Sequence, residues 1–375
     1  MMKIAIVHDY FTQLGGAEKV AEELYNMLPN ADLFATVALT NRMPETLRGV
    51  PIRTSWMQKL PKMNEYYRLY FPLYPLAVSS LDLSAYDLVI SSSSGYVKGV
   101  RASSDAIHVC YCHTPMRWVW SFDSYSARET FGAGVRAVLP TLIRGLRYWD
   151  ESAARQPDHF VANSKTVAAR IQRAYGRSAE VIVPPIDINR FKLSREQDDY
   201  YVVLSRLVSY KRIDLAVSAC TQLGRKLVVI GSGTALESLK AKAGPTIQFL
   251  GRVPDEEVEF YVSRCRALIF PGEEDFGMAP LEVAAAGRPT IAFRAGGAIE
   301  TVVEDVTGVF FDEQTTEALV DAIERFEQRE WPSSVMRRHA EGFSSEAFRE
   351  RFTRFLRRIG APIDEAVAQL GADIR

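Results

Sequence analysis

The stretch PGEEDFGMAPLEVAAAG, residues 271–287, decides the fold class of the second half of this chain. The apolar run just before it, residues 267–270, is typical of a buried strand, and the run that follows the loop is helix-forming. The unit is therefore strand, short loop and helix, with Glu274 in the loop and Glu282 about two turns into the helix. Free backbone amides from Phe276 to Ala279 would point into the same crevice, with the positive end of the helix dipole behind them.

This loop combines two kinds of hydrogen-bonding group. Its carboxylates accept hydrogen bonds from hydroxyls, and its amides donate to phosphate oxygens. Such a combination suits a sugar nucleotide. The alternative is that Glu274 and Glu282 are solvated acids that only favour the start of a helix.

Strand-like and helical runs alternate along the chain, which predicts parallel sheets covered by helices on both faces. The expected strands span residues 3–8, 32–37, 88–91, 106–111, 159–162, 180–183, 201–205, 226–230, 247–250, 267–270, 290–293 and 308–311. The expected helices span residues 17–28, 166–175, 213–223, 235–243, 255–264, 316–329 and 344–358. The fold class is therefore α/β.

A proline-rich segment, residues 184–187, separates the two alternating halves and indicates a hinge. The economical interpretation is two Rossmann-like domains of similar size that face each other across a cleft, one over residues 1–190 and the other over residues 191–343. In such sheets ligands bind at the carboxyl ends of the strands.

Composition excludes several classes of protein. A net charge of −1 argues against nucleic acid as a partner. The four cysteines have neither disulfide-scaffold nor metal-site spacing and fit a reducing cytoplasm. The first residues are strand-like instead of resembling a signal peptide, and no apolar run approaches the roughly 20 residues that span a bilayer. We therefore expect a cytoplasmic protein with no metal and no other cofactor.

Two cations follow the first strand of the second half, in SRLVSYKR, residues 205–212. Arg206 and Lys211 would lie at the carboxyl end of that strand, where a pair of cations can clamp a diphosphate. Lys211 and Arg212 also stand at a helix start, where the dipole disfavours positive charge, so the position calls for a compensating anion. The alternative is a solvated basic turn.

Glycines and one histidine follow other strands. Gly231 and Gly233 form a Gly-x-Gly turn, and Gly15 and Gly16 precede the first helix. At these positions a donor phosphate or sugar can approach the backbone closely, although a bare turn would have the same sequence. His113, in YCHTPMRWVW, ends a strand and could hydrogen-bond a sugar hydroxyl, unless it only caps the turn.

Taken together, these residues resemble the retaining glycosyltransferases of family 4, which have the GT-B fold. The resemblance covers most of the chain. It rests first on a pair of glutamates with seven residues between them, here Glu274 and Glu282, and on an arginine–lysine pair, here Arg206 and Lys211. An N-terminal glycine loop, here Gly15 and Gly16, and a histidine, here His113, complete the set. It also implies that residues 344–375 hold a helix that crosses back to the first domain, followed by a tail.

The resemblance implies a role for the acidic loop. Glu282 would hold the ribose hydroxyls of the nucleotide. Glu274, with the amides of Phe276, Gly277 and Met278, would hold the transferred sugar.

The other residues receive roles in the same way. Arg206 and Lys211 would neutralise the diphosphate as it leaves, which agrees with the general stabilisation of developing negative charge by preorganised cations. His113 would contact the sugar near its C6 hydroxyl, and the backbone around Arg252 and Val253 would meet the base. Because no enzymic nucleophile is evident, the hypothesis is metal-independent front-face displacement with retention.

The HTPMRWVW stretch, residues 113–120, resembles members that use GDP-mannose in bacterial polysaccharide synthesis. We therefore expect a mannosyltransferase, with a UDP-sugar such as UDP-glucose as the alternative donor. A phosphorylase, an epimerase or a catalytically silent GT-B binding protein would be a different kind of protein on the same fold.

Two segments of the first domain indicate the acceptor. Residues 53–76 and 133–148 mix aromatic or aliphatic residues with the cations Arg53, Lys59, Lys62, Arg68, Arg136, Arg144 and Arg147. Such segments suit an anionic membrane surface. We therefore expect a glycan or lipid-linked glycan acceptor and peripheral contact with the inner face of the cell membrane. The alternative is that these segments are helices that pack on the core.

Overall fold

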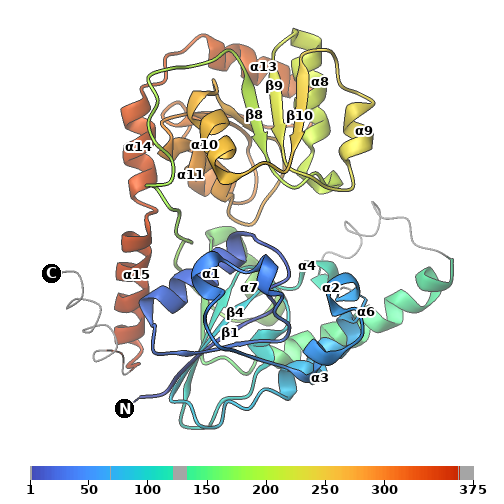
Figure 1. Cartoon of the computed structure of the whole chain (residues 1–375), viewed down its shortest axis with the longest axis vertical. Helices are drawn as coiled ribbons and strands as arrows, with labels where there is room; N and C mark the ends of the chain where they lie inside the picture. Colours follow the sequence, from blue (N-terminus) through green and yellow to red (C-terminus); the bar gives the residue numbers. More distant parts are fainter. Residues whose placement is uncertain (1, 68, 121–132, 362, 364–375) are drawn as a thin grey trace. The chain divides into compact units, whose positions relative to one another are not determined.

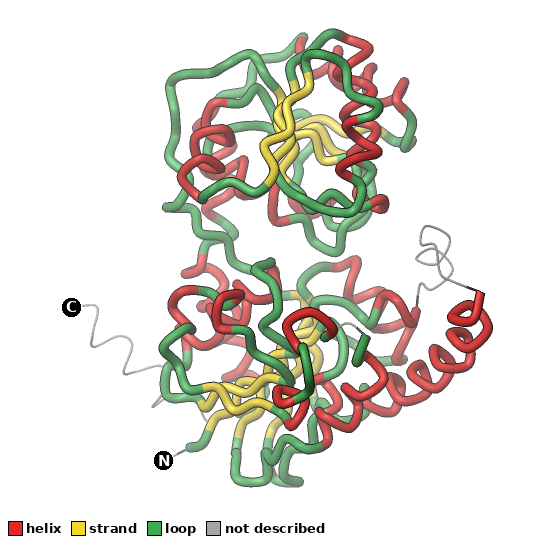
Figure 2. Tube along the Cα trace, turned by 45° about the vertical axis from the view of Figure 1, so that its right-hand side comes forward, coloured by secondary structure: helices red, strands yellow, loops and turns green. Residues whose placement is uncertain are grey.

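The computed structural model describes residues 2–67, 69–120, 133–361 and 363. The chain divides into two compact units, one of residues 1–184 with 348–375 and one of residues 185–347. The first division falls inside the expected hinge, between Pro184 and Pro185. The boundaries expected from the sequence, after residues 190 and 343, differ from these by a few residues. Within each unit helices enclose the strands (Figure 2).

The first unit is built on a seven-stranded parallel sheet with the order β3-β2-β1-β4-β5-β6-β7 (Figure 1). Its strands are β1 (Ile4–His8), β2 (Asp32–Ala35), β3 (Ile52–Thr54), β4 (Leu88–Ser93), β5 (Ile107–Cys112), β6 (His159–Ala162) and β7 (Glu180–Val181). Its helices are α1 (Gly16–Met27), α2 (Met63–Tyr66), α3 (Tyr74–Ser79), α4 (Arg117–Trp120), α6 (Ala133–Ala153), α7 (Lys165–Tyr175) and α15 (Ser345–Arg358), with short 3-10 helices η1 to η5 between residues 40 and 99.

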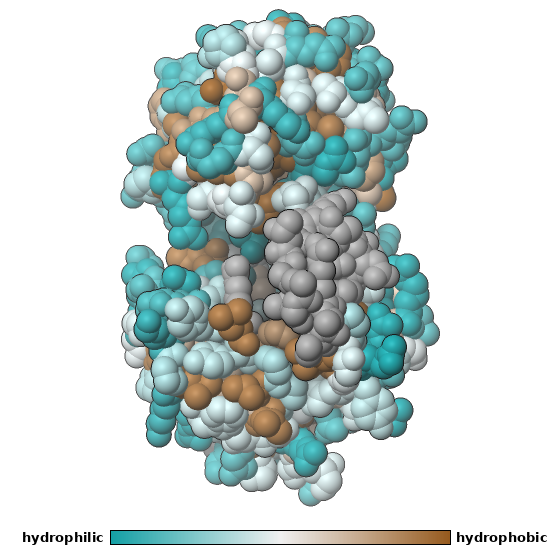
Figure 3. Space-filling view, turned by 90° about the vertical axis from the view of Figure 1, so that its right-hand side faces the viewer, coloured by the Kyte–Doolittle hydropathy of each residue, from teal (hydrophilic) through white to brown (hydrophobic). Residues whose placement is uncertain are grey.

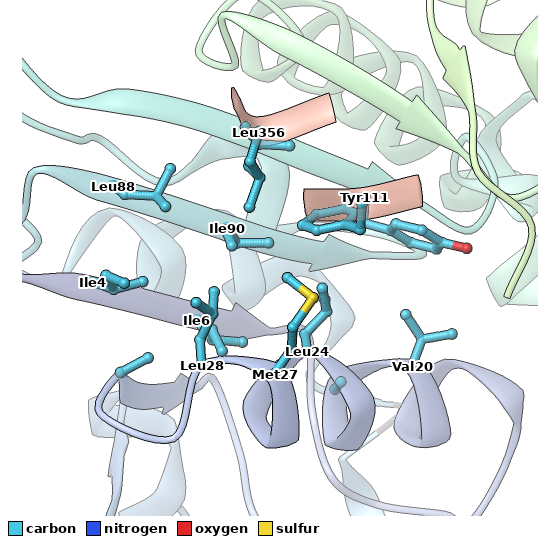
Figure 4. Packing of buried hydrophobic residues seen from close by; sticks show 14 of the residues in the cluster. Ile4, Ile6, Val20, Leu24, Met27, Leu28, Leu88, Ile90, Tyr111 and Leu356 are labelled. Carbon is cyan, nitrogen blue, oxygen red and sulfur yellow. The ribbon is translucent and has the colours of Figure 1, made fainter. Parts of the chain in front are cut away.

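Alternation along the strands gives this sheet two apolar faces. One face packs against α1 and α15, and Figure 4 shows Leu24 and Met27 of α1 in one cluster with Ile6 and Ile90 of the sheet. The other face packs against α3, α4 and α6. The expected C-terminal helix is thus part of this core, because its apolar stripe, which includes Phe352, is buried on the sheet.

The second unit is built on a six-stranded parallel sheet with the order β10-β9-β8-β11-β12-β13. Its strands are β8 (Tyr201–Leu204), β9 (Leu227–Ile230), β10 (Ile247–Gly251), β11 (Leu268–Phe270), β12 (Thr290–Phe293) and β13 (Gly308–Phe311). Its helices are α8 (Ile213–Leu223), α9 (Leu236–Lys240), α10 (Asp255–Arg264), α11 (Met278–Ala285), α12 (Ala298–Thr301), α13 (Thr316–Glu327) and α14 (Ser333–Glu341), and η6 (Ser209–Lys211) follows β8.

These elements confirm the α/β class and the two Rossmann-like domains. Every expected strand is present, with ends that differ from the expected ones by no more than two residues. One local expectation is wrong. Glu282 was expected about two turns into its helix, but α11 starts at Met278, so Glu282 is its fifth residue and lies about one turn from its start.

Candidate active site

The predicted donor residues of the second unit gather at one edge of its sheet. Strand order reverses between β8 and β11, which are neighbours in the sheet although β9 and β10 separate them in sequence. In parallel α/β sheets such a switch point opens a crevice at the carboxyl ends of the strands. Arg206 and Lys211 follow β8, whereas Glu274 and Glu282 follow β11, so the sequence predicted residues from both sides of the switch.

Lys211 and Glu274 are in direct contact. The Lys211 Nζ forms an ion pair with Glu274 Oε1, and the two side chains are only 11% and 22% exposed. Gly272 permits this approach, since a Cβ at that position would lie 2.8 Å from the Lys211 Cα. The loops after β8 and β11 therefore touch, and together they present a cation beside a carboxylate.

The compensating anions for Lys211 and Arg212 come from the chain itself. Lys211 pairs with Glu274, and the Arg212 guanidinium lies 3.2 Å from the Asp214 carboxylate. Arg212 caps α8 in the left-handed region, with φ at 52°. Contrary to the expectation from the sequence, the positive charge at this helix start does not require a bound anion, because the folded chain already supplies the negative charge.

Arg206 has a partner that sequence reasoning missed. The Arg206 side chain is exposed, and its Nη2 donates to Tyr210 Oη at 3.2 Å. The Lys211 Nζ lies 5.5 Å from the centroid of the same ring, within range of a cation–π contact. Tyr210 therefore organises both cations. The spacing of Arg206 and Tyr210 by four residues is the signal that could have revealed it.

Two glycines after β12 hold the acidic loop in place. A Cβ at Gly296 would lie 2.2 Å from the Glu274 carbonyl oxygen, and one at Gly297 would lie 2.1 Å from the Phe276 Cα. The Gly297 amide also donates to the Glu274 carbonyl at 2.8 Å. The Phe276 side chain is buried, so it anchors the loop in the core while its backbone lies at the sheet edge.

The N-cap residue of α11 is a glycine. Gly277, with φ at 86°, has no side chain that could accept from the first amides of the helix. Met278 and Glu282 are both half-buried on this helix. At the other end, the Arg337 Nη1 donates to the Ala285 carbonyl at 2.9 Å and so fixes the helix.

The Gly-x-Gly turn after β9 has a structural role that the sequence did not indicate. A Cβ at Gly231 would lie 1.9 Å from the Ser205 carbonyl oxygen, and one at Gly233 would lie 2.2 Å from the Leu207 carbonyl oxygen. Both glycines thus let this turn pack on the segment that carries Arg206. The side on which a Cβ would project is filled by protein backbone.

Arg252 and Val253 follow β10 at the same edge of the sheet. Arg252 is exposed and Val253 is half-buried. Their predicted contact with the base stays a prediction.

In the first unit, Gly15 and Gly16 lie after β1, and β1 and β4 flank the switch point of that sheet. Gly15 is the N-cap of α1 and Gly16 is its first residue. A Cβ at Gly15 would lie 2.9 Å from Glu18 Oε2, so the loop is tight around this buried carboxylate.

Asp9 joins the loops after β1 and β4 of the first unit. Its carboxylate accepts from the backbone amides of Ser94 at 2.6 Å and of Tyr96 and Val97 at 2.8 Å each. Burial raises the pKa of Asp9, and these hydrogen bonds act in the opposite direction. The signal that could have revealed Asp9 in the sequence is an acid directly after the apolar first strand.

His113 is buried and follows β5 directly. Its Nε2 lies 2.9 Å from Ser92 Oγ, which also lies 3.0 Å from His8 Nδ1. Burial lowers the pKa of both imidazoles to about 3, so the two rings are neutral near pH 7. Neither His8 nor Ser92 was singled out from the sequence.

The described residues hold neither a cluster of metal ligands nor a helix that could span a membrane. Over these ranges, no three histidine, cysteine, aspartate or glutamate side chains are grouped as a metal ion would require. Within the same ranges no helix combines the length and the apolar character needed to cross a bilayer.

Comparisons with known proteins place the chain in a family. A profile described as Glycosyltransferase Family 4 matches residues 14–190, and one described as Glycosyl transferases group 1 matches residues 185–343. The fold and these matches define a glycosyltransferase of the GT-B class. More specifically, the chain belongs to glycosyltransferase family 4.

Relatives with known names are distant. The GDP-mannose-dependent alpha-(1-6)-phosphatidylinositol monomannoside mannosyltransferase of Mycolicibacterium smegmatis is 29% identical over 192 residues, which cover 43% of this chain and 50% of that protein. Human alpha-1,3/1,6-mannosyltransferase ALG2 is 24% identical over 293 residues, which cover 66% of this chain and 67% of that protein. The chain spans about half the length of the first of these relatives.

Solved structures share the fold across nearly the whole chain. HepE of Anabaena, crystallised with UDP, superimposes with a TM-score of 0.72 at 17% identity, over 95% of this chain and all of that one. Sucrose-phosphate synthase of Thermosynechococcus elongatus superimposes with a TM-score of 0.73 at 16% identity, over 96% of this chain and all of that one.

Proposed function

We propose that this protein transfers mannose from GDP-mannose to a lipid-linked glycan, with retention of configuration and without a metal ion. The observation that carries the proposal is the contact of Lys211 with Glu274 at the switch point of the second unit. Arg206 follows the same strand and shares Tyr210 with Lys211. A pair of cations can stabilise the anionic leaving group of a sugar nucleotide, and a carboxylate beside them can accept hydrogen bonds from the hydroxyls of the sugar.

Each group has a chemical task in this proposal. Rupture of the bond between the sugar and the diphosphate builds negative charge on the leaving oxygen, and Arg206 and Lys211 would stabilise that charge. Glu274 would exchange its contact with Lys211 for the hydroxyls of the sugar, and Glu282 would accept from the ribose hydroxyls. The departing phosphate would accept the proton of the acceptor hydroxyl.

The choice of donor rests on similarity and not on a contact. Two relatives carry mannosyltransferase names, one of them GDP-mannose-dependent. The structural neighbour HepE was crystallised with UDP, which keeps UDP-sugars as the second candidate.

The donor can be identified by turnover. Purified full-length protein is incubated with GDP-mannose or UDP-glucose and a bacterial lipid extract as acceptor, and the release of GDP or UDP is measured. We expect release of GDP only. Release of UDP would favour the alternative donor, and release of neither nucleotide would favour a silent binding protein.

Glu282→Ala should weaken the binding of GDP-mannose by about 30-fold. A charge-assisted hydrogen bond to a ribose hydroxyl is worth about 2 kcal/mol, which gives this factor. Titration calorimetry of wild type and variant provides the measurement. Glu324→Ala, on the exposed side of α13, makes the same change away from the site and should leave binding unaltered. Equal affinities of Glu282→Ala and wild type would remove the ribose assignment.

The proposed acceptor is supported by an apolar surface on the first unit. Leu69, Leu76 and Tyr148 are 71%, 63% and 78% exposed, and Figure 3 shows apolar side chains on this unit. A groove of about 430 Å³ between the α3 region and α6 is lined mostly by apolar residues, namely Pro72, Pro75, Thr141, Leu142, Gly145, Leu146 and Trp149.

All five of the expected cations that the structure describes are exposed, namely Arg53, Lys59, Lys62, Arg144 and Arg147. Two of them also have partners in the fold, since Arg53 pairs with Asp32 at 3.3 Å and Arg147 donates to the Val119 carbonyl at 2.9 Å. Arg68 and the side chain of Arg136 lie outside the described residues. We propose that the exposed set faces an anionic membrane that holds the acceptor.

Leu76→Ser combined with Tyr148→Ser should lower the binding of the protein to vesicles by at least tenfold. Removal of two exposed apolar side chains forfeits more than 1.4 kcal/mol of burial in the lipid, at about 25 cal/mol per Å². Flotation with phosphatidylcholine vesicles that contain about one third phosphatidylglycerol measures this. Val306→Ser, an exposed apolar residue of the second unit, is the control. Absence of binding by wild type, or unchanged binding by the double variant, would contradict the proposed surface.

A further inference from the structure

A hydrogen-bonded row of three buried side chains crosses the carboxyl edge of the seven-stranded sheet. His8 ends β1, Ser92 lies one residue before the end of β4, and His113 follows β5. The Ser92 Oγ lies 3.0 Å from His8 Nδ1 and 2.9 Å from His113 Nε2. These three strands are neighbours in the sheet, so the row links residues that are distant in sequence.

Sheet geometry brings the three side chains to one face. His8 and Ser92 are register partners on β1 and β4. His113 stands two residues after Tyr111, and residues two apart in an extended segment share a face; their rings lie 5.2 Å apart. Tyr111 belongs to the face that α1 and α15 cover. The row therefore lies on the α1 side of the sheet, at the edge where Gly15 and Gly16 begin that helix.

The number of protons in the row is limited. Each neutral imidazole carries one N–H, and Ser92 has one O–H. The two rings are the only hydrogen-bond partners of the buried Ser92 Oγ within the described part of the chain. A hydroxyl can also accept from both rings, but its own O–H would then have no partner, which is costly in a buried site. We therefore expect Ser92 to donate to one ring and to accept from the other, so that the tautomer of His113 is coupled to that of His8.

We propose that His8 and Ser92 are positioning residues that hold His113 by its Nε2 in a single tautomer, so that its Nδ1 meets a sugar oxygen of the substrate in one fixed hydrogen-bonding role. This inference rests on the proposed function for the identity of the substrate. The backbone of His113 is fixed as well, because its amide donates to the Ser93 carbonyl at 2.8 Å and its carbonyl accepts from Asn163 Nδ2 at 3.0 Å. Both the ring and the backbone of His113 are therefore held in place.

The tautomer can be read directly by long-range ¹H–¹⁵N correlation spectra of full-length protein with ¹⁵N-labelled histidine. The chain has five histidines, and a His113→Gln variant assigns the signals of interest. We expect His113 to be a single tautomer in wild type. Ser92→Ala and His8→Leu should convert it to a mixture of both tautomers. His8→Asn keeps a hydrogen-bonding amide near the position of Nδ1 and should preserve the wild-type pattern.

Turnover gives a second readout. Ser92→Ala should lower kcat about tenfold, the equivalent of one neutral hydrogen bond, and leave KM for the donor within twofold. The chain offers a matched control, because Ser91 Oγ makes the same 2.9 Å contact with Nε2 of the buried His108. Ser91→Ala should change the signals of His108 alone and leave kcat unaltered.

The outcomes separate this inference from the proposed function. A mixture of His113 tautomers in wild type, or an unchanged tautomer in Ser92→Ala, would overturn the coupling of the two rings through Ser92. An altered tautomer with unchanged kcat would overturn the positioning role. If the spectra are as expected but the protein turns over no nucleotide sugar, the proposed function is overturned and the coupling of the two rings stands.

Discussion

Lys211→Ala should lower kcat by about 10²- to 10³-fold while the dissociation constant of the donor rises less than tenfold. The ammonium of Lys211 is held beside Glu274 in a site of low exposure before any donor arrives. Its charge is of most use when the diphosphate leaves, because negative charge on the leaving oxygens is greatest at that point. Single-turnover rates and calorimetric affinities on the same preparations separate the two effects.

The ion pair itself can be tested with a second substitution. Glu274→Gln removes the carboxylate that Lys211 contacts, and the double variant Lys211→Ala, Glu274→Gln completes a cycle. Because the two residues touch, we expect their effects on kcat to be non-additive. Lys240→Ala, on α9 and paired only with Glu237 among the contacts described, is the control and should behave as wild type. A Lys211→Ala variant that loses affinity alone would assign Lys211 to ground-state binding.

Strand positions were predictable from the sequence because buried parallel strands carry continuous apolar runs. The four residues of β8 and of β9 are apolar, or aromatic in the case of Tyr201, and both runs were identified. Strand β3 was missed because it is only three residues long and half exposed at the sheet edge. Helix α14 was missed because its apolar content is low, with Met336 and Ala340 as its buried residues.

Placement of the site at the strand ends was predictable for the same reason. Loops that follow neighbouring parallel strands meet at one edge, so residues after β8 and β11 could be grouped without coordinates. Which residues within that group contact each other could not be predicted from the sequence. Contact of Lys211 with Glu274 depends on the absence of a side chain at Gly272, and the hydrogen-bonded row from His8 to His113 depends on strand register. Both depend on pairs that are distant in sequence.

Gly297→Ala should lower the free energy of unfolding by about 3 kcal/mol and abolish donor binding in the protein that remains folded. A Cβ at this position would lie 2.1 Å from both the Cα and the carbonyl oxygen of Phe276. Backbone atoms cannot rotate away, so the loop after β11 must move, and overpacking of this kind costs about 1–3 kcal/mol or more. The movement would break the 2.8 Å bond from the Gly297 amide to the Glu274 carbonyl and displace the acid from Lys211.

Gly308→Ala separates loss of stability from loss of the site. A Cβ at Gly308 would lie 1.9 Å from the Thr290 carbonyl oxygen, an equally severe clash with backbone. Both residues begin their strands, so this clash is at the amino edge of the sheet, opposite the predicted donor loops. Denaturant unfolding should show similar destabilisation of the two variants, whereas calorimetry with GDP-mannose at low temperature should show binding by Gly308→Ala alone. If Gly297→Ala binds the donor as tightly as Gly308→Ala does, the position of the Glu274 loop does not govern recognition of the sugar.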